Sequence, residues 1–318
     1  MSVFYVKANI YNFESWRTEF EIKDVKFYVE TFLKVRDKFR KEINPQITGY
    51  VELNIENMDN CDKAIEIAQK KLELYSKAMS FAQGHDVFFN DFSCYEFTNG
   101  IKTIKQEISY IVRIGKSFGS GIVATPHITA FLEKSIPKLL DDEFLEATGI
   151  DRALDWYNIS KSLKVVDNIF IALFMGLEIL ANSWANYSHK EYILTSDELI
   201  GLEKEFHDLV KYKLQIEPSC RRSALYSNLK GLNRVSIANK IFKLLECHGI
   251  PSYSNNIREI VRLRDSIIHG EKIDYNTLNV FNLNNILEKI LEKIILAELE
   301  IGEEVLHGNI FKILENGV

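Results

Sequence analysis

Residues 256–270 read as one helix that carries charge where an ordinary core helix would not. At about 100° per residue its apolar side chains fill one broad arc, and Arg264 falls near the middle of that arc. A guanidinium on the apolar side of a helix is costly unless it has a partner or a role. On the opposite flank, Asp265 and His269 are spaced so that the carboxylate can reach the imidazole. The helix thus supplies an arginine for binding an anion, a carboxylate, and a histidine for moving a proton.

The end of this helix is predicted at Gly270, which offers a left-handed C-terminal cap. His269 would then lie in the last turn, where the negative end of the helix dipole favours the protonated imidazole. Arg258 and Arg262 share the sector of His269. The histidine is therefore expected to act as a proton donor beside two further cations.

The six residues from Arg264 to His269 resemble the R-x4-H signature of HEPN domains, all-helical modules that include many metal-independent RNA-cleaving enzymes. The order of helices over roughly residues 155 to 301 is similar to the ApeA-like branch of that group. The family's pattern commonly allows Asn, Asp or His after the arginine, so Asp265 is compatible with activity. The resemblance implies a homodimer in which two copies of the motif meet across the dimer axis.

The resemblance also implies the catalytic roles. Arg264 would bind the phosphate through its fixed fork of donors, and His269 would act as general acid or base. Asp265 would hold the imidazole through a hydrogen bond. The expected products carry a 2',3'-cyclic phosphate and a 5'-hydroxyl, and neither a metal nor a cofactor is required.

Glu178 is a second charge at a position where an apolar residue is expected. Either it pairs with Arg264 across the bundle and orients the guanidinium at the site, or it forms a structural ion pair with no direct part in chemistry. The candidate RNA-binding residues are Arg258, Arg262, Arg221 and Arg222. Lys230 and Arg234, like Arg221 and Arg222, lie on the segments that precede the motif helix. Each alone also fits a solvated surface charge, whereas together they would form a phosphate track whose affinity falls with salt.

The first half of the chain alternates between extended and helical patterns, which predicts an α+β domain over residues 1–120. The expected strands are Val3–Tyr11, Phe20–Ile22 paired with it, and Ile47–Ile55. The expected helices are Lys26–Ile43 and Cys61–Phe81, the latter capped by Asn60. A hairpin is expected from Asp86–Phe97 and Lys102–Ile114.

Residues 121–154 read as a linker or transition, and residues 155–318 as an all-α helical bundle of the HEPN type. One long helix is expected over Tyr157–Ala185, followed by helices from Ser196, over Ser219–Leu229 and over Ser236–Cys247. The last long helix, from Leu278 to about Val305, carries two apolar stripes, which suits a dimer contact.

Composition indicates a soluble globular protein of 318 residues with a net charge of -6, which argues against wholesale nonspecific nucleic-acid binding. Four cysteines are scattered without metal-ligand spacing, so reduced thiols in a cytoplasm are expected. No signal peptide is visible, and the apolar run Ile169–Ala181 is too short to span a bilayer of ~30 Å. A cytoplasmic protein without a membrane partner is therefore expected.

The leading hypothesis is a homodimeric metal-independent HEPN endoribonuclease. Its first domain would sense a trigger protein, bind an antitoxin or select the RNA. The resemblance alone implies a toxin or abortive-infection effector in antiphage defence. The alternative is a noncatalytic HEPN interaction or nucleotide-binding module, in which the motif is structural and the dimer acts as a scaffold.

Overall fold

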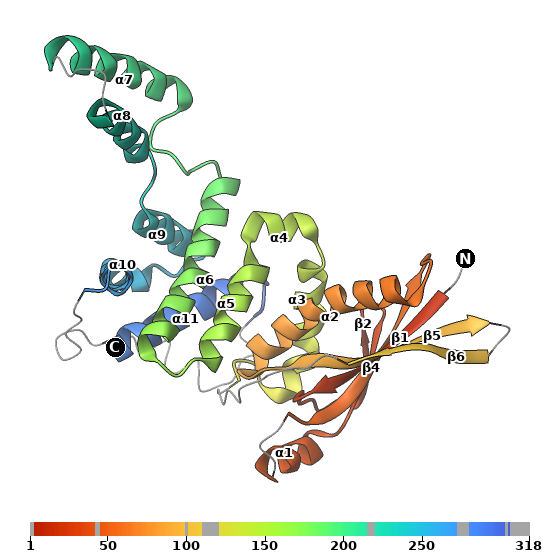
Figure 1. Ribbon diagram of the computed structural model, residues 1–318. Helices are drawn as coiled ribbons and strands as arrows, with labels where there is room; N and C mark the ends of the chain where they lie inside the picture. The colour runs from red at the N-terminus through yellow and green to blue at the C-terminus, as the bar shows by residue number, and fades with distance from the viewer. Residues whose placement is uncertain are drawn as a thin grey trace. The chain divides into compact units, whose positions relative to one another are not determined.

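A computed structural model describes residues 3–41, 45–98, 101–109, 121–214, 220–271, 280–302 and residue 305. The chain divides into two compact units (Figure 1). The first comprises Met1–Gly176 together with Asp274–Val318, and the second comprises Leu177–Ile273. An antiparallel sheet with helices is followed along the chain by a mostly helical half, which confirms the predicted fold class.

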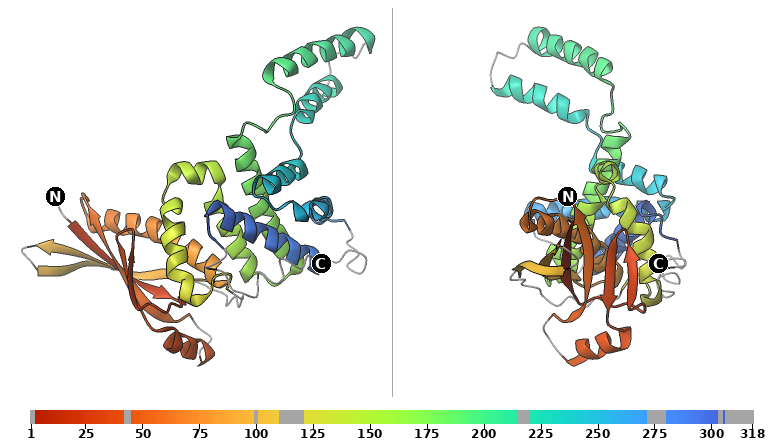
Figure 2. Two further views of the ribbon diagram at one scale, coloured as in Figure 1. Left: turned by 180° about the vertical axis from the view of Figure 1, so that it is seen from behind. Right: turned by 90° about the vertical axis from the view of Figure 1, so that its right-hand side faces the viewer.

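The first unit is built on a six-stranded sheet with strand order β2-β3-β4-β1-β5-β6. All of its neighbouring strands are antiparallel. The strands are β1 (Val3–Tyr11), β2 (Glu19–Ile22), β3 (Val25–Val29), β4 (Ile47–Glu56), β5 (Phe88–Thr98) and β6 (Ile101–Ile108). Alternate residues of β1 are buried, because successive side chains of a strand point to opposite faces. Helix α2 (Cys61–Gln83) packs on the sheet through β1, β4 and β5 (Figure 2).

Several sequence predictions for this unit are confirmed. The strand over Val3–Tyr11 matches β1. The side chain of Asn60 accepts a hydrogen bond from the Lys63 N–H at 3.0 Å, which caps α2. The predicted hairpin appears as the pairing of β5 with β6. Residues 99–100 of its turn and the predicted extension over 110–114 lie outside the described residues.

The predicted helix Lys26–Ile43 is wrong at its start, because β3 occupies Val25–Val29 and helix α1 begins at Phe32. Helix α1 is described over Phe32–Lys41, and the predicted end at residues 42–43 lies outside the described residues. Burial in β3 alternates, so the periodicity there is that of a strand. The predicted partner of Phe20–Ile22 is also wrong, since β2 pairs with β3 and not with β1. Lys23 and Asp24 both have positive φ, at 46° and 61°, as a two-residue hairpin turn requires.

Helices complete the first unit. They are η1 (Thr125–His127), α3 (Ile128–Leu139), α4 (Asp142–Thr148), α5 (Ile150–Ser162), the first half of α6 (Val166–Tyr187) and α11 (Val280–Glu298). The segment 121–154, read from the sequence as a transition, thus contains α3 and α4, and both α3 and α5 pack against α2. The predicted single helix over Tyr157–Ala185 is wrong. Leu163 is extended, at φ -82° and ψ 149°, and separates α5 from α6.

The regular elements described in the second unit are all helices, and one isolated β-bridge pairs Tyr192 with Arg234. The unit contains the second half of α6, α7 (Ser196–Asp208), η2 (Leu209–Lys213), α8 (Cys220–Leu232), α9 (Ile237–Cys247), η3 (Pro251–Tyr253) and α10 (Ser254–Ile268). Its core lies between α9 and α10, where apolar side chains of both helices are buried. The side chain of Lys240 on α9 donates to Asn182 Oδ1 on α6 at 2.9 Å. Helix α10 is therefore held by its packing against α9, which in turn is bonded to α6.

Helix α6 is the one described helix that is long and apolar enough to cross a membrane by length and composition. Half of its apolar window is buried inside the structure. Its buried side chains include Phe170, Leu173 and Leu177. Such burial is the pattern of a core helix in a globular protein, which agrees with the interpretation of Ile169–Ala181 from the sequence.

Candidate active site on helix α10

Helix α10 positions the motif because its apolar face is anchored in the core. Ile257, Ile260 and Leu263 on this face are buried. The helix stops at Gly270, which has a φ of +68°. The Gly270 N–H donates to the carbonyl oxygen of Ile267 at 3.2 Å, and the Glu271 N–H donates to that of Ser266 at 2.9 Å. These two bonds form a Schellman cap, so the predicted glycine cap is confirmed.

Arg264 lies between two carboxylates. Its Nη1 donates to Asp265 Oδ1 at 2.9 Å, and its Nη2 lies 3.5 Å from Glu178 Oε2 on α6. The Arg264 and Glu178 side chains are each about a quarter exposed, at 26% and 22%. The contact with Glu178 is long for a hydrogen bond, so Asp265 is the closer partner and Glu178 acts mainly through charge. The pairing expected between Glu178 and Arg264 is therefore present.

His269 occupies the C-cap position of α10 and is exposed to solvent. Its backbone N–H donates to the Asp265 carbonyl oxygen at 2.9 Å. Between the described side chains of Asp265 and His269 no hydrogen bond forms, because the Asp265 carboxylate accepts from the neighbouring guanidinium. The contact expected between Asp265 and the imidazole is thus replaced by one to Arg264. A permanent cation beside the carboxylate attracts it more strongly than an exposed imidazole does.

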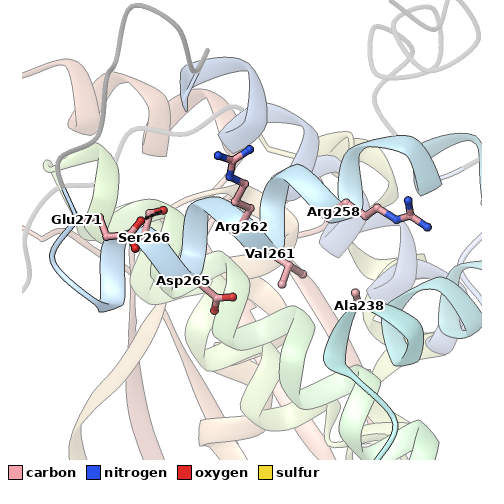
Figure 3. Close-up of a pocket in the computed structure, with 7 residues that line it drawn as sticks. All are labelled: Ala238, Arg258, Val261, Arg262, Asp265, Ser266 and Glu271. Carbon is pink, nitrogen blue, oxygen red and sulfur yellow. Dashed lines mark hydrogen bonds between the residues drawn. The ribbon is translucent and has the colours of Figure 1, made fainter.

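A pocket of about 480 Å³ lies on the solvent side of α10 (Figure 3). It is lined by Ala238, Arg258, Val261, Arg262, Asp265, Ser266 and Glu271. The Ser266 hydroxyl donates to Glu271 Oε2 at 2.7 Å. In Figure 3 the guanidinium of Arg262 and the carboxylate of Asp265 extend from opposite sides of the helix ribbon. Asp265 is the residue shared by this pocket and the Arg264 pair.

The four candidate RNA-binding arginines lie on two helices, α8 and α10. Arg258 and Arg262 line the pocket and are exposed. Arg221 and Arg222 belong to α8, but their side chains lie outside the described part of the structure. Among the residues that the structure describes, no group of three or more His, Cys, Asp or Glu side chains could hold a metal ion.

Sequence reasoning did not single out Ser266 and Glu271, which line the pocket and bond to each other. Ser266 lies four residues after Arg262, so helical spacing alone would have found it on the same face. Glu271 follows the glycine cap and has no regular spacing from the helix. Its position depends on the reversal of the chain at Gly270, which the sequence did not define beyond the cap itself.

Residues 171–305 match the family model described as Apea-like HEPN. The matched segment contains α10 and the two carboxylates, Asp265 and Glu178, that lie beside Arg264. HEPN domains are generally associated with RNase activity or with defence-related nucleotide-binding roles, and they often dimerise and bind RNA. No curated protein and no solved structure matches the chain.

Proposed function

Because residues 171–305 match the family model described as Apea-like HEPN, we propose that the protein is a metal-independent endoribonuclease whose catalytic residues are Arg264 and His269. The observation that carries this proposal is the fixed guanidinium of Arg264, held by Asp265 and Glu178 five residues before the exposed His269. A guanidinium that is held in place is ready to bind a phosphate without reorganisation.

The chemistry requires a phosphate clamp and proton transfer. The ribose 2'-oxygen attacks the adjacent phosphorus and loses its proton, while the bond from phosphorus to the 5'-oxygen breaks and that oxygen gains a proton. Arg264 stabilises the charge that gathers on the nonbridging oxygens, since its planar fork fits two of them. His269 moves a proton as general acid or base. The products carry a 2',3'-cyclic phosphate and a 5'-hydroxyl.

The active form in this proposal is a homodimer. Proton removal and proton donation occur on opposite sides of the reacting phosphorus, so one imidazole serves both steps less well than two. Two copies of α10 facing each other across a two-fold axis supply both groups. The exposure of His269 supports this arrangement, because its imidazole is accessible to a second chain and to RNA.

Arg258, Arg262, Arg221 and Arg222 guide the RNA in this proposal. Arg258 and Arg262 are exposed along α10, so they can bind phosphates next to the scissile bond. Their contribution is electrostatic and falls as salt rises. The cellular role that fits such an enzyme is that of a toxin or abortive-infection effector in antiphage defence, in the cytoplasm. The domain at residues 1–120 would then receive the trigger or an antitoxin.

The test is RNA cleavage in EDTA. Purified wild-type protein is incubated with total RNA, and the double variant Arg264→Ala/His269→Ala is incubated alongside it. We expect cleavage by the wild type alone, and enzymatic end mapping should find cyclic phosphates and 5'-hydroxyls. Cleavage by the double variant at the wild-type rate, or products with 5'-phosphates, would reject the proposed chemistry.

Substitution of Glu178 tests its orienting role. Glu178→Gln keeps the shape and one acceptor but removes the charge that faces Arg264 Nη2. We expect cleavage to slow about 10-fold, a loss of about 1.4 kcal/mol of transition-state stabilisation. RNA-cleavage rates and melting temperatures are measured together.

Glu246→Gln is the matched control for Glu178→Gln, because Glu246 is exposed on α9. Glu246→Gln should leave both the RNA-cleavage rate and the melting temperature unchanged. An unchanged cleavage rate in Glu178→Gln would reduce Glu178 to a structural ion pair.

A noncatalytic nucleotide-binding module is the second candidate. The pocket of about 480 Å³ favours it, because Arg258 and Arg262 can both donate to phosphate oxygens there. Calorimetry with ATP and GTP in the presence of EDTA checks this candidate. Nucleotide binding that Arg262→Ala abolishes, in a protein that cleaves no RNA, would replace the nuclease by this function.

A further inference from the structure

The pocket on α10 contains a carboxylate that the proposed chemistry does not use. Two acidic side chains, Asp265 and Glu271, line this pocket of about 480 Å³. Asp265 Oδ1 accepts from the guanidinium of Arg264 at 2.9 Å, so a cation balances its charge. Glu271 Oε2 instead accepts from the neutral Ser266 hydroxyl at 2.7 Å. This hydrogen bond holds the Glu271 carboxylate in place without balancing its charge.

The pocket also holds positive charges that stay apart from Glu271. Arg258 and Arg262 line it. In the part of the chain that the structure describes, the ion pairs of α10 are those of Arg264, and neither of the two lining arginines pairs with Glu271. Figure 3 shows Ser266 and Glu271 together at one end of the labelled residues, with Arg262 and then Arg258 farther along the helix. A carboxylate is thus followed along one face by two cations.

A carboxylate beside cations that bind RNA needs a specific reason, because it repels phosphates. A base edge that carries hydrogen-bond donors supplies this reason, since a carboxylate is acceptor-only and offers about four lone-pair sites on its two oxygens. The bond from Ser266 occupies one site on Oε2. Each oxygen of Glu271 can therefore still accept a hydrogen bond. The Glu271 carboxylate fits two donors that lie side by side.

Guanine is the standard RNA base that presents such a pair of donors, N1–H and the exocyclic N2–H, on its Watson–Crick edge. Adenine and cytosine place one amino donor beside a ring nitrogen that accepts, and the N3–H of uracil lies between two carbonyl oxygens. Those acceptors would face the Glu271 oxygens and be repelled by them. Unpaired bases of RNA are commonly recognised on this edge. The chemistry of Glu271 therefore favours guanine.

We propose that the pocket on α10 binds a guanine nucleotide of the RNA, with Glu271 accepting from N1–H and N2–H of the base. Ser266 is a positioning residue that holds the carboxylate. Arg258 and Arg262, which are four residues apart and so lie on one face of the helix, bind the adjoining phosphates. The inference rests on the proposed function, since it names the base that is recognised next to the site of cleavage.

The experiment measures binding of short single-stranded oligonucleotides to the full-length wild-type protein by fluorescence anisotropy in EDTA. The oligonucleotides carry 2'-O-methyl groups, which remove the attacking hydroxyl, and they differ only in one central base. We expect the guanine probe to bind at least about 10-fold more tightly than the adenine, cytosine and uracil probes. Inosine is guanosine without the N2 amino group. The inosine probe should bind about 5-fold more weakly than the guanine probe, because one hydrogen bond to Glu271 is lost.

Glu271→Gln tests whether the carboxylate recognises the base. The amide keeps the shape but turns a donor toward guanine in place of one acceptor, so this variant should bind the guanine and inosine probes equally, within about 2-fold. The helix cap is preserved, because the bond to Ser266 at the end of α10 comes from the backbone N–H of residue 271. Glu259→Gln is the matched control, since Glu259 is exposed on the same helix but is not among the lining residues. It should keep the wild-type preference for guanine.

Equal binding of the guanine and inosine probes by the wild type would overturn the proposal, as would a preference for guanine that survives in Glu271→Gln. GMP is the probe for a free nucleotide. We expect GMP to bind at least about 100-fold more weakly than the guanine oligonucleotide, because it lacks the adjoining phosphates. If GMP binds as tightly, the pocket serves a free nucleotide and its assignment to RNA is overturned.

None of these affinities depends on cleavage. A preference for guanine in a protein that fails the EDTA cleavage assay would therefore support this binding site and reject the nuclease alone. Cleavage without a preference for guanine would do the reverse.

Discussion

Arg264→Ala should lower the rate of RNA cleavage by about 100-fold to 1000-fold while the protein stays folded. The guanidinium in this site is held by Asp265 at 2.9 Å and by Glu178 at 3.5 Å. Its donors are therefore aimed before the substrate arrives, and the alanine variant loses that stabilisation of the transition state entirely. Single-turnover cleavage of a fluorescent RNA, with the enzyme in excess, measures the effect on the chemical step.

Arg264→Lys separates charge from geometry. Lysine keeps the positive charge but lacks the planar fork that contacts two oxygens at once, so we expect it to rescue little of the lost rate. Arg258→Ala serves as the matched control on the same helix, since Arg258 is exposed and lies six residues before Arg264. It should weaken RNA binding and leave the single-turnover rate within about 3-fold of wild type, because a peripheral phosphate contact acts on binding alone. Equal losses of the single-turnover cleavage rate in Arg258→Ala and Arg264→Ala would contradict a role for Arg264 in transition-state stabilisation.

The parts of the fold that followed from the sequence are those with a strong local signal. The strand Val3–Tyr11 alternates buried and half-buried residues along its whole length, and Asn60 and Gly84 mark the two ends of α2. The errors fall where local signals were weak. The turn at Lys23 and Asp24 lacks the glycine usual in such hairpins. The break at Leu163 contains neither glycine nor proline, so no residue type in the sequence indicated the end of α5.

In the candidate site, too, the features with a local sequence signal were predicted and those set by tertiary packing were not. The arc of apolar residues on α10 placed Arg264 toward the bundle, and its contact with Glu178 follows from that position. The partner of Asp265 could not be predicted, because helical spacing favours His269 whereas a long arginine side chain can bend to the adjacent carboxylate. The pocket depends on Ala238 of α9 and on Glu271 beyond the cap. Its shape is therefore a property of tertiary packing that no spacing along the chain defines.

Outside the site, a cluster of ionisable groups is buried where α5 packs against α11. The Tyr157 hydroxyl donates to Glu292 Oε1 at 2.5 Å, and Lys161 forms an ion pair with Glu288. Burial, followed by the charge of Glu288, raises the pKa of Glu292 from 4.5 to about 7. The hydrogen bond from Tyr157 opposes this shift without cancelling it. Glu292 therefore keeps its proton in the folded protein under conditions in which it is ionised in the unfolded chain.

This shift makes stability depend on pH. An acid whose pKa is raised on folding stabilises the protein fully below its unfolded pKa of 4.5, and that contribution is lost as the pH rises through about 7. The loss over this window is roughly 3 kcal/mol. Glu292→Gln keeps an oxygen that accepts from Tyr157 but cannot ionise. Relative to wild type, its melting temperature should therefore fall less between pH 5 and pH 8 and should be higher at pH 8.

Thermal unfolding followed by circular dichroism at several pH values measures the difference. Glu146→Gln on α4 is the control, because Glu146 is exposed and lies in the same unit. It should follow the wild-type pH dependence. A Glu292→Gln variant with the same pH dependence as wild type would mean that Glu292 is already ionised in the fold and that Lys161, rather than a retained proton, balances the charge of both glutamates.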